Sequence, residues 1–378
     1  MSNKTKKLKI LHVTFNMGIG GTEQVIRQLV SGLPPNRFDN VILCIDGSVG
    51  ETGKQLEEQG TSVVAFKRKP GFDMGLVRKM HRLIKEGGID ILHCHQYTPW
   101  VYGWLAARGT DTRVIFTEHG RFHPDHHRYK AVLVNPLMAL MTQGVVAISK
   151  ATRSALSQYE FVPMKRIEVI YNGIQPLAPD LVAVDSIRRG FGIEGSDFVL
   201  GTVARLDPVK NQILMLDAFA EVLKEKPNCW LLIVGDGPDR ALLENKANEL
   251  GVSGRTIFTG FIAQPLNYLA AMDVFLLSSH TEGTSMTLLE AMSLGIPAVV
   301  TNVGGNPEIV VDNKTGILTE PGSLEAFARS IKKLTSDRAM LENFSRESRA
   351  TFARAFSLER MIASYELLYE RAISKFGY

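Results

Sequence analysis

The sequence predicts an α/β protein with two Rossmann-like domains that face a central cleft. Three observations predict this fold class. Short runs rich in β-branched residues alternate with longer segments of helical period, the pattern of parallel strands joined by crossover helices. This alternation stops near residue 172 and then starts again. The 378 residues also exceed what one hydrophobic core usually serves.

We place the first domain at residues 1–174. Its expected strands are almost entirely apolar, as in sheets covered on both faces. These strands are Lys9–Thr14, Asn40–Ile45, Ser62–Phe66, Asp90–His93, Arg113–Thr117, Val145–Ile148 and Ile167–Ile170. Helices are expected between them, for example at Glu23–Ser31 and Met74–Lys85.

A break follows the first domain. Gly173, Pro176 and Pro179 fall in a stretch with little periodicity, which predicts a linker at residues 175–190. The second domain, residues 191–356, repeats the alternation. Its expected strands are Phe198–Val203, Trp230–Val234, Thr256–Thr259, Val274–Leu277 and Ala298–Thr301. Its expected helices are Asn211–Lys224, Asp239–Leu250, Met286–Leu294 and Leu324–Leu334.

The C-terminal segment, residues 357–378, is expected to form a helix. Apolar and aromatic side chains recur there at helical spacing. They are Met361, Ile362, Tyr365, Leu368 and Tyr369.

Composition excludes several classes of protein. Hydrophobic residues make up 45% and charged residues 22% of the chain, as in ordinary globular proteins. No apolar run is long enough to span a bilayer, and the N-terminus lacks the apolar core of a secretory signal. The three cysteines give no disulfide framework, so we expect a cytoplasmic protein. The net charge of +4 is too small to indicate nucleic-acid binding.

Polar segments follow several of the predicted strands, where open α/β sheets bind ligands. The first runs from Asn16 to Glu23 and contains Gly18, Gly20 and Gly21. Glycines allow close backbone approach, and the start of the next helix favours anions. Glu23 replaces the third glycine of a dinucleotide-binding motif, so a plain tight turn remains the alternative interpretation.

A second segment places Arg205 and Lys210 after the first strand of the second domain. Two cations beside a helix start would gather phosphate oxygens. The alternative is ordinary surface charge. A further glycine turn, Val303–Glu308, leads into a short predicted helix. It is equally consistent with part of the site and with an ordinary loop.

The most informative segment runs from Ser278 to Pro297. Ser285 is expected to cap a helix that Gly295 ends. The N–H groups at the helix start, around residues 284–287, form an anion site. Glu282 lies before the helix and Glu290 within it, and these carboxylates suit sugar or ribose hydroxyls. Apolar neighbours make an unpaired charge at Glu290 costly.

Two further features leave alternatives open. The first domain carries histidines that could bind zinc, but no cysteine or carboxylate completes a tetrahedral set, so we expect no metal. These histidines are His93, His95, His119, His123, His126 and His127. The basic residues of Lys67–Lys69 and Arg78–Lys85 form either a solvated helix face or a docking site for anionic lipid.

Together these segments resemble the retaining glycosyltransferases of family 4, which have the GT-B fold, and the resemblance covers nearly the whole chain. The specific part is the pair of glutamates Glu282 and Glu290 with Gly283 and Ala291-Met292. The other matching pieces are Gly20–Glu23, Asp90–His95, Thr117–His119, Asn172-Gly173, Arg205 with Lys210, Gly304–Glu308 and the helix beginning Leu358-Glu-Arg.

The resemblance implies roles for individual residues. Arg205 and Lys210 neutralise the diphosphate that leaves. Glu282 contacts the sugar of the nucleoside diphosphate sugar, and Glu290 binds its ribose. The remaining implied contacts are the amides of Gly283, Thr284, Ser285 and Met286 to phosphate and sugar, Phe261 and Ile262 beside the base, Gly20 and Gly21 over the diphosphate, and His119 near the sugar. The terminal helix would cross back onto the first domain. Many relatives have Phe-Gly where this chain has Thr284-Ser285, which affects the choice of sugar.

The resemblance thus implies a metal-independent hexosyltransferase without cofactors. It would use a UDP-sugar in preference to a GDP-sugar. Its acceptor would be a glycan or lipid-linked molecule of cell-surface polysaccharide or glycoconjugate biosynthesis, with the inner face of the plasma membrane as an alternative location. A sugar-nucleotide epimerase and a non-catalytic nucleotide-sugar binding protein on the same fold are the competing functions. A phosphorylase and a nicotinamide dehydrogenase fit less well, because this chain lacks a pyridoxal-binding lysine and a complete dinucleotide motif.

Overall fold

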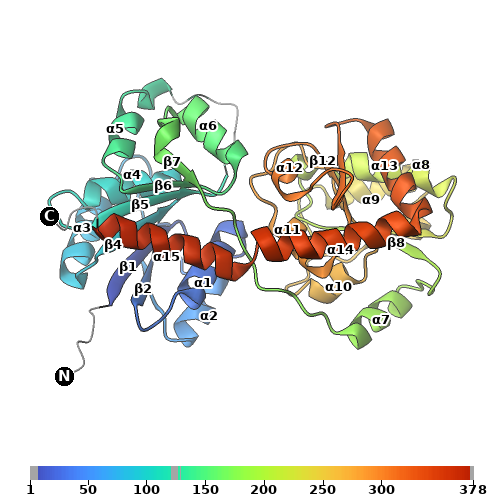
Figure 1. The fold of residues 1–378 in the computed structure, drawn as a ribbon, viewed down its shortest axis with the longest axis horizontal. Coiled ribbons are helices and arrows are strands. Elements are labelled where there is room, and N and C mark those ends of the chain that lie inside the picture. The colour runs from blue at the N-terminus through green and yellow to red at the C-terminus, as the bar shows by residue number, and fades with distance from the viewer. Residues whose placement is uncertain (1–6, 121–126, 128, 375–378) are drawn as a thin grey trace. The chain divides into compact units, whose positions relative to one another are not determined.

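The computed structural model describes residues 7–120, 127 and 129–374. It divides into two compact units (Figure 1). The first unit extends to Gly173 and also includes the C-terminal helix from Leu358, and the second is Ile174–Ser357. The three cysteines are buried and free, in agreement with the expected absence of disulfides.

The first unit contains a parallel sheet of seven strands in the order β3-β2-β1-β4-β5-β6-β7. The strands are β1 Leu8–Thr14, β2 Phe38–Cys44, β3 Ser62–Ala65, β4 Ile91–His95, β5 Arg113–Glu118, β6 Gly144–Ala147 and β7 Ile167–Val169. All seven predicted strands are confirmed, with ends shifted by one or two residues. Most side chains of β1, β2, β4, β5 and β6 are buried, which explains why these runs are almost entirely apolar.

Helices connect and cover these strands. They are α1 Gly21–Gly32, α2 Glu51–Glu58, α3 Met74–Gly87, α4 Tyr97–Ala106, α5 Val134–Leu140 and α6 Lys150–Glu160, with short 3-10 turns at Tyr129–Ala131 and Met164–Arg166. Helix α15, Leu358–Ser374, also belongs to this unit and contacts α1. Its predicted apolar stripe is buried, and the Tyr369 hydroxyl lies 2.8 Å from Nδ1 of His93.

The second unit contains a parallel sheet of six strands in the order β10-β9-β8-β11-β12-β13. The strands are β8 Phe198–Val203, β9 Cys229–Val234, β10 Thr256–Phe258, β11 Val274–Leu277, β12 Ala298–Thr301 and β13 Gly316–Thr319. The five predicted strands are confirmed. Strand β13, at the edge of this sheet, was not predicted from the sequence.

The helices of the second unit surround this sheet. They are α7 Leu181–Gly190, α8 Gln212–Leu223, α9 Arg240–Glu249, α10 Leu266–Ala270, α11 Met286–Leu294, α12 Asn306–Ile309, α13 Leu324–Ser336 and α14 Arg338–Ala355, with 3-10 turns at Pro208–Lys210 and Ser253–Arg255. None of the helices within the described ranges is long and apolar enough to cross a membrane.

The segment predicted as a linker, residues 175–190, differs from the expectation. It lies in the second unit, and its second half is helix α7. Asp180 starts this helix, because its carboxylate accepts hydrogen bonds from the N–H groups of Val182 and Ala183. Arg188 then fastens the helix to the carbonyl oxygens of Asp197 and Ala271. Residues 175–180, which include Pro176 and Pro179, form no helix or strand, as predicted, and helix α7 follows them.

Candidate active site

The sheet of the second unit has a topological switch point between its two central strands. The chain moves outward from β8 to β9 on one side and from β11 to β12 on the other. All the strands are parallel, so their carboxyl ends share one edge. Open α/β sheets bind ligands at such a point, where the loops diverge. Lys210 follows β8 and Glu282 follows β11, so both lie in loops that leave this point.

A side chain and a short helical turn fix the position of Lys210. Oδ1 of Asp207 accepts hydrogen bonds from the backbone N–H groups of Val209 and Lys210. Asn211 then adopts a left-handed conformation, with φ of 50°, before helix α8 begins. The hydroxyl of Ser278 donates to the carbonyl oxygens of Lys210 and Asn211, which ties this turn to the end of β11.

Lys210 and Glu282 form an ion pair. Nζ of Lys210 lies 2.7 Å from Oε1 of Glu282, and the Ser279 hydroxyl donates to the same oxygen over 2.6 Å. The Glu282 side chain is only 8% exposed, whereas that of Lys210 is 25% exposed. The ammonium group has three N–H donors, so it can hold Glu282 and still bind another anion.

A glycine turn supports the backbone of Glu282. The Gly305 N–H donates to the Glu282 carbonyl oxygen over 3.1 Å. Gly304 has φ of +51°, and a Cβ atom there would lie 1.8 Å from the same oxygen. The segment Val303–Glu308 is therefore not an ordinary loop. It supports the backbone of Glu282, and only glycine at position 304 permits this contact.

Arg205 lies on the same loop as Lys210, but its side chain is 71% exposed. Its Nε atom is 3.7 Å from Oδ2 of Asp207, at the long end of ion-pair distances. A surface pair of this kind contributes little stability. Arg205 can therefore turn towards a bound anion at small cost.

Helix α11 begins as the sequence predicts. The Ser285 hydroxyl accepts a hydrogen bond from the Leu288 N–H, and Gly295 ends the helix with φ of +70°. Gly283, Thr284 and Ser285 lead into the first turn, where helix amides attract negative charge. This helix start directly follows the loop that carries Glu282, the partner of Lys210. The amides of helix α11 and the ammonium group of Lys210 therefore lie at the same end of the sheet, where the strands end.

Glu290 lies on helix α11 between buried apolar side chains. Burial raises the pKa of its carboxyl group from 4.5 to about 7. Within the described ranges the structure gives this carboxyl group no hydrogen-bond or ion-pair partner. Such a group is poised to accept hydrogen bonds from a ligand, which is the behaviour expected of functional carboxyl groups.

Phe261 and Ile262 follow β10 and a bridge between Gly235 and Gly260. The Phe261 side chain is 59% exposed, unusual for an aromatic residue without a partner surface. The glycines of the β9 loop were missed by the sequence analysis. A Cβ atom at Gly235 would lie 2.0 Å from the Ala204 carbonyl oxygen, so this loop packs directly against the loop of Arg205. The Gly235-Asp-Gly237 spacing after a strand was the available signal.

In the first unit, Gly20 and Gly21 start helix α1 after β1. Gly20 is extended and has no side-chain cap, so the first N–H groups of α1 are not held by a capping side chain. The Glu23 carboxylate turns back towards Gly20, because a Cβ atom at Gly20 would lie 2.4 Å from Oε2 of Glu23. Burial raises the pKa of Glu23.

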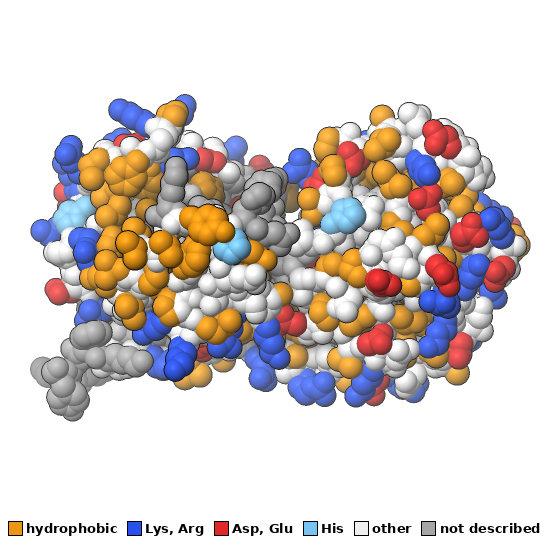
Figure 2. All heavy atoms as spheres, turned by 90° about the horizontal axis from the view of Figure 1, so that it is seen from above, with side chains coloured by type: hydrophobic (Ala, Val, Ile, Leu, Met, Phe, Trp, Pro, Cys, Tyr) orange, Lys and Arg blue, Asp and Glu red, His pale blue; other side chains and the backbone are white. Residues whose placement is uncertain are grey.

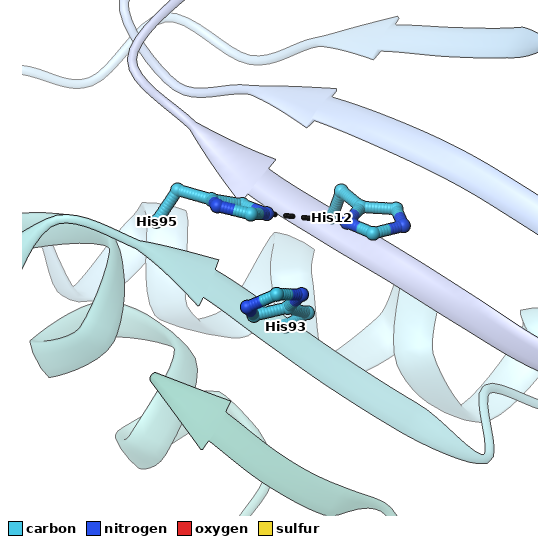
Figure 3. A group of neighbouring side chains, drawn as sticks. All are labelled: His12, His93 and His95. Carbon is cyan, nitrogen blue, oxygen red and sulfur yellow. Dashed lines mark hydrogen bonds between the residues drawn. The ribbon is translucent and has the colours of Figure 1, made fainter. Parts of the chain in front are cut away.

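His119 directly follows β5 and hydrogen-bonds to His95. His93 and His95 of β4 lie beside His12 of β1, a residue that the sequence analysis did not select (Figure 3). His12, His93 and His95 are the one group of described side chains close enough to share a metal ion. His127 is elsewhere, against Tyr129 and Tyr159, and His123 and His126 lie outside the described residues.

The surface of the first unit carries a group of exposed apolar side chains, which we call the α5 face. Figure 2 shows hydrophobic side chains gathered over the first unit. The α5 face consists of Tyr129, Val132, Leu133, Val134, Leu137, Leu140 and Met141. Leu133 is 83% and Leu140 is 62% exposed. The basic side chains of α3, at Arg78, Lys79, Arg82 and Lys85, are also exposed.

Two parallel α/β units, with cations, carboxylates and a helix start at the sheet edge of the second, define the class of GT-B glycosyltransferases. Comparisons with known proteins agree. Residues 19–176 match the model described as Glycosyltransferase Family 4. Residues 183–351 match the model described as Glycosyl transferases group 1. The chain belongs to this family of glycosyltransferases.

Individual relatives extend over most of the chain. It is 27% identical to the UDP-Gal:alpha-D-GlcNAc-diphosphoundecaprenol alpha-1,3-galactosyltransferase of Escherichia coli, over 98% of both proteins. It is 31% identical to the GDP-mannose-dependent alpha-(1-6)-phosphatidylinositol monomannoside mannosyltransferase of Mycolicibacterium smegmatis, over 68% of this chain and 70% of the relative. The crystal structure of Anabaena HepE in complex with UDP has the same fold, with a TM-score of 0.84, 23% identity and coverage of 97% of this chain and 100% of that chain.

Proposed function

We propose that this glycosyltransferase moves a hexose from a nucleoside diphosphate sugar to an acceptor hydroxyl group, with retention of the anomeric configuration and without a metal ion. The observation that carries the proposal is the ion pair between Lys210 and Glu282 at the switch point of the second unit. This pair brings together an ammonium group, which would bind phosphate, and a carboxylate, which would face the sugar.

The diphosphate would bind between Lys210, Arg205 and the start of helix α11. Amides of Gly283, Thr284, Ser285 and Met286 would contact phosphate and sugar oxygens. Glu290 would accept hydrogen bonds from the ribose hydroxyls, which would explain a half-buried carboxyl group that has no partner among the described residues. Phe261 and Ile262 would cover the base, since an exposed aromatic ring gains burial by stacking.

The reaction would break the bond between the anomeric carbon and the phosphate oxygen. Charge develops on the leaving β-phosphate, where Lys210 and Arg205 supply fixed positive charge. The acceptor oxygen bonds to the anomeric carbon from the same face, and its proton passes to an oxygen of the leaving phosphate. Glu282 would stabilise the positive charge on the sugar ring. Lys210, Arg205 and the amides of helix α11 would neutralise this charge, as a metal ion does at other phosphate sites.

Gly20, Gly21 and His119 of the first unit are the residues that the family resemblance assigns to the diphosphate and the sugar. We favour a UDP-sugar, since the Escherichia coli relative is named for UDP-Gal and the HepE structure holds UDP. A GDP-sugar is the alternative, because the mycobacterial relative is named for GDP-mannose.

The acceptor would be a glycan or lipid-linked molecule of cell-surface glycoconjugate biosynthesis, as the names of these two relatives suggest. The α5 face offers a means to reach a lipid-linked acceptor. Exposed apolar side chains grouped on one surface mark an interaction site, and a bilayer interface buries such side chains. We therefore propose peripheral docking of this face on a membrane, with the basic residues of α3 adding attraction to anionic lipids.

A panel of UDP- and GDP-sugars tests the function. Thermal-shift measurements identify a stabilising sugar nucleotide, and release of the nucleoside diphosphate is then followed with and without acceptor glycans. A transferase releases the diphosphate and transfers the sugar. Stabilisation without release would indicate a binding protein, and a changed sugar on an intact nucleotide would indicate an epimerase; either result would contradict the proposal.

A further inference from the structure

Four histidines meet inside the first unit, where polar rings are costly unless paired. His12 comes from β1, His93 and His95 from β4, and His119 follows β5. His12, His93 and His95 have no exposed surface. Figure 3 shows the three rings side by side across the two neighbouring strands.

Three of the rings and one amide form a continuous hydrogen-bonded chain. Oδ1 of Asn40, on β2, lies 3.2 Å from Nε2 of His12. Nδ1 of His12 lies 3.2 Å from Nε2 of His95, the contact dashed in Figure 3. Nδ1 of His95 lies 2.9 Å from Nε2 of His119. Each link needs one N–H donor and one acceptor.

The rings are neutral near pH 7. Burial lowers the pKa of His12 to about 4 and that of His119 to about 3, and it holds the pKa of His95 well below its usual range. A neutral imidazole carries one N–H group and one lone pair. The position of a single proton therefore decides the direction of every link in the chain.

The Asn40 oxygen determines that direction, because it can only accept. His12 must then donate from Nε2, which leaves its Nδ1 as an acceptor. His95 must in turn donate from Nε2 to His12, and His119 must donate from Nε2 to His95. The chain ends at Nδ1 of His119, a buried lone pair without a partner among the described residues.

We propose that Asn40, His12 and His95 are positioning residues that hold His119 in the Nε2–H tautomer, so that its Nδ1 atom stays a hydrogen-bond acceptor. The effect of this tautomer on turnover rests on the proposed function, whereas the tautomer itself does not. The hydrogen bond at Nε2 fixes the orientation of the His119 ring and leaves its Nδ1 as an acceptor. The carboxylate partner of a catalytic histidine fixes ring orientation and tautomer in the same way.

A metal ion is the competing explanation, since the ligand atoms of His12, His93 and His95 lie within 4.8 Å of one another. His93, however, already uses both nitrogens, Nδ1 with the Tyr369 hydroxyl and Nε2 with the Thr117 hydroxyl, each over 2.8 Å. A metal would have to break these bonds and the link between His12 and His95. The group also offers no thiolate or carboxylate ligand.

The test reads the tautomers directly, by ¹⁵N NMR of the imidazole nitrogens of ¹⁵N-histidine-labelled protein at pH 7.5. We expect His12, His95 and His119 as neutral Nε2–H tautomers. Asn40→Leu removes the anchor of the chain from its half-buried end. In this variant part of the His119 signal should move to the Nδ1–H tautomer, and kcat should fall about tenfold, the effect of one lost oriented hydrogen bond. Asn40→Asp, whose carboxylate can only accept hydrogen bonds, should restore the tautomer and most of the kcat.

Asn36→Leu is the matched control, because Asn36 is exposed and lies outside the chain of hydrogen bonds. It should leave the tautomers and kcat as in the wild type. A His119 Nδ1–H tautomer in the wild type, an unchanged tautomer in Asn40→Leu, or stoichiometric zinc by elemental analysis would overturn the proposal. The expected tautomers in a protein without transferase activity would support the chain of hydrogen bonds and overturn the proposed function.

Discussion

Nζ of Lys210 lies 2.7 Å from Oε1 of Glu282, although 72 positions separate the two residues in the sequence. The Glu282 side chain is 8% exposed, whereas the Lys210 side chain is 25% exposed. The ion pair therefore contributes to the stability of the folded protein and also to the proposed catalysis. Each side chain holds the other in position before a phosphate group binds, so variants at the two positions should change both stability and turnover.

Lys210→Met and Glu282→Gln should each lower turnover by about 100-fold, because each removes a charge that would stabilise the transition state. Each variant also leaves one charge of the pair unmatched, so each should lower the melting temperature. The double variant should recover stability but not turnover, since neither charge remains. Calorimetry and initial rates measure both effects. Lys224→Met is the control, because Lys224 forms an exposed pair with Glu221. Normal transfer by Lys210→Met would refute the phosphate clamp.

Arg205→Ala should also cut turnover by about 100-fold yet leave the melting temperature of the free protein unchanged. The side chain is exposed and its contact with Asp207 is long, so it contributes little to stability. Isothermal titration with the nucleoside diphosphate should show weaker binding. Arg329→Ala, an exposed arginine paired with Glu325 on α13, should change none of these values. Full activity of Arg205→Ala would remove this residue from the site.

Glu290 predicts a pH dependence. Its pKa is raised to about 7, so the folded protein holds this proton more tightly than the unfolded chain. The free energy of unfolding should therefore fall as the pH rises from about 4.5 to about 7, by at most about 3 kcal/mol. Glu290→Gln should remove this slope, which thermal melts from pH 5 to pH 8 can measure.

The same variant should weaken binding of the sugar nucleotide. Ribose hydroxyls bind the ionised carboxylate best, so wild-type affinity should increase between pH 6 and pH 8, and the affinity of Glu290→Gln should not. Glu249→Gln, an exposed change on α9, should retain the wild-type slope and affinity. An unchanged slope in Glu290→Gln would mean that another group titrates.

Gly304→Ala should displace Glu282. The added Cβ atom would lie 1.8 Å from the Glu282 carbonyl oxygen, and the residue has φ of +51°. We expect a loss of stability of more than about 1 kcal/mol, the cost of backbone strain alone, and a large loss of turnover. Gly322→Ala separates the two causes, because Gly322 also has positive φ but nothing within 4 Å. Gly322→Ala should lose stability modestly and keep its turnover; equal effects would contradict the proposed contact.

The α5 face predicts membrane docking. Replacing Leu133 and Leu140 together with Glu should abolish sedimentation with vesicles of anionic phospholipid, while turnover on a water-soluble acceptor is retained. Leu367→Glu is the control, because this leucine is 59% exposed but lies on α15, outside the α5 face. Arg78→Glu with Arg82→Glu should weaken binding only at low salt, since screening limits surface charge. Wild-type protein that stays in the supernatant at low salt would refute docking.

Local features of the fold and site could be predicted from the sequence. Apolar runs between glycine turns located the strands of the two described sheets except β13, since a strand buried on both faces is almost entirely apolar. Ser285 and Gly295 marked the ends of helix α11 because capping depends on neighbouring residues alone. Asp180 carried the same kind of signal for α7, but Pro176 and Pro179 led to the prediction of a linker there.

Only the tertiary structure decided which of these segments meet. The neighbours of each strand are set by packing of the whole sheet, so the contact between Lys210 and Glu282 could not be read from their spacing. The burial that raises the pKa of Glu290 likewise exists only in the folded chain. His12 gave no signal at all, because its partners Asn40 and His95 come from two other strands. The sequence determines local features such as strand runs and helix caps, because these depend on neighbouring residues. Burial and long-range hydrogen bonds exist only once the chain has folded.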